Sequence, residues 1–328
     1  MKVLLTGASG FVGSHILDCL CARGIPTAIL VRRTSNRGFL GAHGSEVEVH
    51  FGAITDPASL LPAVRDVTHV IHCAGCTKAR RPADFWETNQ VGTRHLVAAV
   101  NQEAKRVQRF VLISSLAASR PATSDVPALE VDPPRPVTLY GRTKLAAERE
   151  VQTQCQTQWV ILRPPGVYGP RDRDFLQLYQ AIQAGFCPRF GGGGQELSLV
   201  YAQDLAEAAV ACLTHPAAAG GIYNVAAREV VTTGELLAEV AGQMGRHPFS
   251  PSLPTALLWP ICLAQEVKTW LTGKPGILSR QKYPELRAPG WVCDPSRLWQ
   301  ELGLDCPTLL RSGVAATLGW YRQHHWLR

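Results

Sequence analysis

The sequence predicts an α/β fold, with a doubly wound parallel sheet followed by a smaller, mainly helical C-terminal lobe. Two observations predict it. Over residues 1–165, short β-rich runs alternate with segments of helical periodicity, which is typical of parallel strands joined by crossover helices. After about residue 226 the chain becomes helical in pattern and rich in Pro, Leu and Trp.

The individual elements follow from β-branched apolar runs and from the amphipathic segments between them. In the first part we expect strands at residues 3–5, 27–31, 46–50, 69–72, 109–113 and 159–162. Helices are expected at 12–22, 57–63, 92–101 and 140–155. Further on we expect strands at 197–201 and 221–225, and helices at 204–214 and 233–244. The proline-rich stretch 121–136 predicts an irregular loop.

Composition limits the classes of function. The chain has 328 residues, 46% hydrophobic and 18% charged, which predicts a globular protein with a sizeable core. Its net charge of +7 is compatible with nucleic acid, an anionic membrane surface or anionic ligands. The arginines are scattered rather than gathered in a basic arm, so we expect no nucleic-acid partner.

Cysteine usage and hydropathy address the compartment. The ten cysteines show no paired rhythm, which favours a reducing environment. Cys73 and Cys76 have CxxC spacing, but no second such pair completes a zinc site, so no metal is predicted. Met1 leads directly into a strand, and no apolar run reaches the roughly 18–20 residues that span a bilayer. We therefore expect a cytoplasmic protein.

A glycine-rich turn follows the first strand. In Thr6-Gly-Ala-Ser-Gly-Phe-Val-Gly13, Gly7 permits a tight turn, Gly10 allows backbone to approach a diphosphate, and Gly13 allows helix and strand to pack closely. The following helix N-terminus offers free N–H groups to phosphate oxygens. The pattern predicts a dinucleotide site, the alternative being a purely structural turn.

The end of the second strand bears on which dinucleotide binds. A site that prefers NAD usually has an acid there to hold the ribose 2′-hydroxyl. This chain has Arg32 and Arg33, whose guanidinium groups suit a 2′-phosphate. We therefore predict NADP, with NAD less favoured, unless the two arginines are simply exposed residues at a strand end.

Tyr140 and Lys144 share one face of a predicted helix, because residues four apart are neighbours there. A nearby ammonium favours the phenolate, so we expect Lys144 to lower the Tyr140 pKa and make the phenol a general acid or base. Alone, the spacing is equally compatible with a half-buried tyrosine beside a solvated lysine.

Five motifs in order resemble the extended short-chain dehydrogenase/reductases, the epimerase/dehydratase-like superfamily, over essentially the whole chain. They are TGASGFVG at 6–13, NQVGT at 89–93, ISS at 113–115, YGRTK at 140–144 and LRPPGVYGP at 162–170. The resemblance implies a Rossmann-like NADP-binding domain over 1–165, with a late strand near 221–226 returning to the sheet. It also implies a substrate-binding lobe over 166–328.

The same resemblance implies the site residues. Ser115, rather than its neighbour Ser114, matches the catalytic hydroxyl, with Tyr140 as proton donor or acceptor and Lys144 on the nicotinamide ribose. The implied cofactor-binding residues are Gly7, Ser9, Gly10, Phe11, Val12, Gly13, Arg32, Arg33, Ile54, Ala74, Gly75, Tyr140, Lys144, Pro164, Gly166 and Val167. Ala53 departs from the family's frequent Asp, which leaves the adenine contact to backbone or Ile54.

The substrate is the open question. Nucleotide-sugar members often carry Asn where this chain has Pro165 and Gly166, and the later segments resemble the 3β-hydroxysteroid dehydrogenase and dihydroflavonol reductase branch. We expect a hydrophobic, sterol- or isoprenoid-like secondary alcohol or ketone. The alternatives are a nucleotide-sugar epimerase, dehydratase or reductase, and a non-catalytic NADP-binding protein.

Two expectations concern partners. Residues 253–271 carry Trp259 and Trp270 and predict either a peripheral membrane contact or a helix packed within the lobe. The family resemblance also implies a homodimer.

Overall fold

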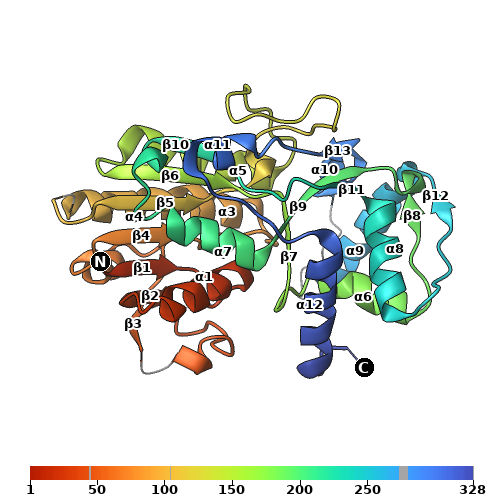
Figure 1. Cartoon of the computed structure of the whole chain (residues 1–328), viewed down its shortest axis with the longest axis horizontal. Helices are drawn as coiled ribbons and strands as arrows, with labels where there is room; N and C mark the ends of the chain where they lie inside the picture. The colour runs from red at the N-terminus through yellow and green to blue at the C-terminus, as the bar shows by residue number, and fades with distance from the viewer. Residues whose placement is uncertain (44–45, 104, 273–279, 328) are drawn as a thin grey trace.

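Seven parallel strands form the central sheet, in the order β10-β6-β5-β4-β1-β2-β3 (Figure 1). This computed structural model describes residues 1–43, 46–103, 105–272 and 280–327. The strands are β1 Val3–Thr6, β2 Thr27–Val31, β3 Val47–Phe51, β4 His69–His72, β5 Arg109–Ile113, β6 Gln158–Arg163 and β10 Gly221–Asn224. The predicted doubly wound α/β fold is confirmed.

Helices cover both faces of the sheet. On one face lie α1 Phe11–Ala22, α7 Ala202–Ala211 and α11 Ser296–Leu302; on the other lie α2 Leu60–Val64, α4 Gly92–Gln102 and α5 Leu139–Gln154. Strand β1 shows why each face needs cover. Val3 and Leu5 belong to one core and Leu4 to the other, and all three are fully buried. Successive strand residues point to opposite faces, so a covered sheet has strands that are apolar throughout.

The C-terminal lobe lies at one end of the sheet (Figure 1). Its helices are α6 Phe175–Gln183, α8 Thr233–Met244, α9 Leu258–Thr272, α10 Tyr283–Arg287 and α12 Leu310–Gln323. Its strands are β7 Gly166–Tyr168, β9 Glu196–Tyr201, β11 Val230–Thr232 and β13 Gly290–Trp291 in one small sheet, and β8 Arg189–Phe190 with β12 Ser252–Leu253 in another. The lobe is thus less purely helical than the sequence predicts.

Most expected elements occur within one or two residues of their predicted bounds, and β2, β4, β5 and α8 match them. The expected helix at 57–63 is instead a 3₁₀ turn, Pro57–Ser59, leading into α2. The helix expected at 204–214 begins at Ala202 and ends at Ala211. Two further elements, α3 Pro82–Phe85 and the π-helical segment Trp86–Val91, lead into α4 and lie outside the predicted helices.

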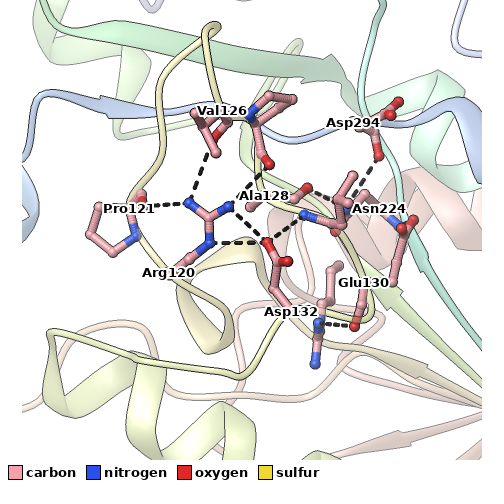
Figure 2. Close-up of polar contacts among 11 residues, drawn as sticks. Arg120, Pro121, Val126, Ala128, Glu130, Asp132, Asn224 and Asp294 are labelled. Carbon is pink, nitrogen blue, oxygen red and sulfur yellow. Dashed lines mark hydrogen bonds and ion pairs between the residues drawn. The ribbon is translucent and has the colours of Figure 1, made fainter.

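The loop predicted at 121–136 connects β5 to α5 and is held by polar contacts (Figure 2). Arg120 binds the Asp132 carboxylate and donates to the carbonyl groups of Pro121, Val126 and Pro127. The Asn224 side chain, at the end of β10, donates to Ala128 O and Asp294 O. This irregular segment is therefore fixed against the sheet edge, and α5 begins from a defined position.

The segment at 253–271 has features of both proposed roles. Leu258 and Cys262 of α9 are buried, whereas Leu257, Trp259 and Leu263 are exposed. The side chain of Trp270 lies outside the described residues. No helix within the described ranges combines the length and apolar character needed to cross a bilayer.

Candidate active site

A cavity of about 1250 Å³ lies between the carboxyl edge of the sheet and the C-terminal lobe. Gly7, Cys73, Ser114 and Pro164 line it, and each directly follows one of the strands β1, β4, β5 and β6. Ligands of open α/β sheets bind at this edge. We call this side the sheet wall. The opposite side, formed by Leu197, Leu199, Glu285, Leu286 and Trp291, is the lobe wall.

The glycine turn is built for a close backbone approach. Gly7 has φ +80°, and a Cβ there would lie 2.7 Å from Ala74 N. A Cβ on Gly13 would lie 2.0 Å from Gly7 O, so α1 can pack against the turn only with glycine at this position. At Gly10, which caps α1, no side chain bonds the first N–H groups of the helix. These donors remain available to a ligand, so the turn fits a dinucleotide diphosphate.

A chain of hydrogen bonds holds the loop after β4 against that turn. Thr93 Oγ1 donates to Asn89 O, so it accepts from His72 Nε2, at 3.0 Å. His72 Nδ1 therefore accepts from Thr6 Oγ1, at 2.7 Å, and Thr6 in turn accepts from Ala74 N. Burial lowers the pKa of His72 to about 3, so the ring stays neutral at pH 7. The hydrogen bonds through it therefore keep the same donors and acceptors.

Asn89 holds the same loop from the other side. Its Oδ1 accepts from Cys76 N at 2.7 Å, and its Nδ2 donates to Cys76 O and to Thr143 Oγ1 of α5. The π-helical segment that carries Asn89 adds a residue to the helical turn there, as is common at functional sites. The NQVGT motif was noted in the sequence, but this positioning role of Asn89 was not inferred.

Ser115 and Tyr140 both line the cavity, and the Ser115 side chain is near enough to the phenol to lower its pKa. Gly141 makes this possible, because a Cβ there would lie 2.1 Å from Ala117 O in the turn that follows Ser115. Lys144, one turn along α5, is buried and donates to Ile113 O at 2.7 Å. The structure therefore brings together the three residues predicted to be catalytic.

The expected lowering of the Tyr140 pKa is wrong for this structure. Burial raises the pKa of the Tyr140 phenol to about 12; the Ser115 side chain opposes this, and the Glu285 carboxylate adds to it. Burial also lowers the pKa of Lys144 to about 8. Desolvation is thus the largest influence on both groups, and the phenol keeps its proton at neutral pH.

A buried ion pair lies behind the sheet wall. Arg163 and Glu148 are 4% and 1% exposed, with Arg163 Nη2 2.7 Å from Glu148 Oε2. Ser114 Oγ donates to the same carboxylate at 2.5 Å. This bond explains why Ser115, and not Ser114, is the partner of Tyr140.

The predicted cofactor residues fall into two groups. Those that line the cavity are Gly7, Ser9, Gly10, Phe11, Val12, Gly13, Gly75, Tyr140, Lys144, Pro164, Gly166 and Val167. Arg32 and Arg33 are exposed outside it, with the Arg33 guanidinium 4.9 Å from the centre of the Phe51 ring. Ile54 is buried in the core under α4, and Ala74 packs behind Gly7. The structure does not bring these four to the cavity lining.

The lobe wall was missed by the sequence analysis. Gln195 Nε2 donates to the carbonyl groups of Glu285 and Ala288, and Trp291 Nε1 also donates to Glu285 O. The contacts of Gln195 join segments about 90 residues apart in the chain. No local motif marks them, so only a tertiary structure could identify them.

Comparison with known proteins places the chain in a family. Residues 3–226 match the model of the NAD-dependent epimerase/dehydratase family. The chain belongs to this family. Because its members are mostly enzymes, an oxidoreductase of the short-chain dehydrogenase/reductase type is supported at the level of the superfamily.

Similar proteins span nearly the whole chain. A ceramide reductase of Caulobacter vibrioides is 29% identical over 99% of this chain and 96% of its own. The sterol demethylase protein B of Methylococcus capsulatus is 28% identical over 98% and 99%. Among solved structures, a UDP-glucose 4-epimerase of Thermus thermophilus in complex with NAD superposes with a TM-score of 0.79, at 26% identity over 98% and 99% of the two chains.

Proposed function

We propose that the protein transfers hydride between NADP(H) and a secondary alcohol or ketone of a hydrophobic, sterol- or isoprenoid-like substrate. The observation that carries the proposal is that Ser115, Tyr140 and Lys144 line one cavity together with the glycine turn. A proton-handling pair and a diphosphate cradle on one cavity are what nicotinamide-dependent hydride transfer requires.

The cofactor would be held by backbone at one end and by side chains at the other. Gly7, Gly10 and the N-terminus of α1 would bind the diphosphate. Gly75 is close to Lys144, since a Cβ on Gly75 would lie 3.8 Å from Lys144 Nζ. The ammonium and this loop can therefore contact one ribose. Pro164, Gly166 and Val167 would lie against the nicotinamide.

The proton chemistry follows from the pKa directions. With its pKa raised to about 12, Tyr140 is protonated at neutral pH and can donate to the oxygen of a ketone. Ser115 would donate to the same oxygen and orient it. When bound, the nicotinamide supplies or accepts the hydride, and its oxidised ring adds a positive charge that favours the phenolate in the reverse direction.

The substrate class rests on the relatives and on the cavity. The two full-length relatives named above are a ceramide reductase and a sterol demethylase protein, both named for lipids. Leu197, Leu199, Leu286 and Trp291 give the lobe wall apolar surface that suits such a ligand. The rival substrate is a nucleotide sugar, which the similarity to UDP-glucose 4-epimerase favours.

NADP rather than NAD remains our proposal for the cofactor. The support is Arg32 and Arg33 at the end of β2, where no acid stands. The structural neighbour bound to NAD favours the opposite choice.

Peripheral membrane contact through 253–271 and a homodimer stay predictions.

The test is turnover with a substrate panel. The wild-type protein should consume NADPH with long-chain and sterol ketones and leave UDP-glucose unchanged. Tyr140→Phe should lower kcat by about 100- to 10,000-fold while NADPH binding stays within about threefold. Tyr179→Phe, which removes a hydroxyl from a buried tyrosine of the lobe, is the matched control and should keep its turnover. Epimerisation of UDP-glucose with retained NAD would overturn the lipid proposal.

A further inference from the structure

Glu285 is a carboxylate at the cavity that the chemistry described above does not use. It lies on α10, lines the cavity, and is near enough to Tyr140 to act on the phenol electrostatically. Its side chain is 28% exposed. The lobe wall therefore carries a carboxylate that acts electrostatically on the phenol at the sheet wall.

The other acids that line the cavity already have protein partners. Asp172 accepts from Asp174 N at the start of α6, and Asp174 is paired with Lys78. Glu285 has only a longer contact among the ion pairs of the described residues, with Lys282 Nζ 3.6 Å from its Oε1. Among the described residues no donor bonds this carboxylate, which has about four sites that can accept.

Two hydrogen bonds fix the backbone that carries Glu285. Its carbonyl accepts from Gln195 Nε2 and from Trp291 Nε1, both at 3.0 Å. These bonds hold α10 against β9 and β13. The backbone that carries Glu285 is therefore already ordered, so a ligand has only the side chain left to order.

We propose that Glu285 is a specificity-determining residue, accepting a hydrogen bond from a hydroxyl or amide N–H on the carbon next to the reacting carbonyl. This inference rests on the proposed function and narrows it to lipids with a polar donor beside the reacting carbon. A plain ketone leaves the carboxylate without that partner and should be the poorer substrate.

The experiment compares two probes. One is a long-chain ketone; the other is the same ketone with an acetamido group on the neighbouring carbon. Wild-type protein should prefer the acetamido ketone by about tenfold or more in kcat/KM. Glu285→Gln should remove most of that preference, because kcat/KM should fall more for the acetamido ketone than for the plain ketone. Glu239→Gln, which neutralises an acid of α8 that does not line the cavity, should keep the preference.

A second readout separates recognition from a structural role. The groups that act on the Tyr140 phenol are Ser115, Glu285, Cys73 and Cys76, and Lys144 lines the same cavity. Removing the Glu285 charge should move the pH midpoint of alcohol oxidation down by about half a unit to one unit, since a nearby anion holds the phenol protonated. Glu285→Asp keeps the charge and should leave the midpoint in place.

The outcomes distinguish the two proposals. An unchanged preference and midpoint in Glu285→Gln, with Tyr140→Phe inactive, overturns the role of Glu285 alone. Equal turnover of both ketones by the wild type has the same consequence. Full activity of Tyr140→Phe on both probes overturns the proposed function itself.

Discussion

The two walls of the cavity are built in different ways. The sheet wall consists of residues that directly follow adjacent strands, and it is backed by the buried Arg163–Glu148 pair. The lobe wall is assembled from β9, α10 and β13, which side-chain to carbonyl bonds hold together. The first carries the groups suited to cofactor and proton chemistry. We propose that the second faces the substrate, so that chemistry and specificity would reside on separately built surfaces.

The largest expected effect comes from breaking the support of the sheet wall. Glu148→Gln leaves the Arg163 guanidinium buried without its carboxylate, and should lower the free energy of unfolding by about 3–5 kcal/mol. Urea unfolding measures it. Arg228→Gln breaks an ion pair with Asp305, whose two side chains are 58% and 44% exposed. It should lower the free energy of unfolding by no more than about 1 kcal/mol. Equal losses of unfolding free energy in the two variants would show that the buried pair stabilises the fold no more than an exposed one.

The next prediction concerns the contact that brings Tyr140 to Ser115. Gly141→Ala places a methyl group against Ala117 O and should cost about 1–3 kcal/mol of stability and most of the turnover. Gly242→Ala, in α8 of the lobe, meets nothing within 4 Å and should instead be neutral or stabilising by up to about 1 kcal/mol. If Gly141→Ala keeps stability and turnover, the close approach of α5 is not what forms the pair.

The smallest effect is expected outside both walls, at the end of β2. Replacing Arg32 and Arg33 by Ala should weaken NADPH binding about tenfold or more and NADH binding by less than about threefold. The reason is that only NADPH carries the 2′-phosphate. Fluorescence titration measures both affinities. Arg106→Ala, at a surface ion pair with Asp66, should change neither. Equal weakening of the two cofactors would remove the preference for NADP.

The sheet wall was predictable because its signals are local. The spacing of Gly7, Gly10 and Gly13 and the pair Tyr140 and Lys144 each lie within one turn or helix, next to a recognisable strand. The lobe wall was not predictable, because Gln195 and Glu285 meet only after the chain has folded. The prediction of a lowered Tyr140 pKa failed for a related reason. Burial, which raises this pKa, is a tertiary property and cannot be read from the spacing of Tyr140 and Lys144.

The most direct measurement of the central claim follows the hydride itself. NADPH deuterated at the transferred position is mixed with a long-chain ketone, and the alcohol product is analysed by mass spectrometry. Wild-type protein should place one deuterium on the carbinol carbon per turnover, and Tyr140→Phe should form almost no labelled product. Unlabelled alcohol from the wild type, or equal labelling by the variant, would contradict the account.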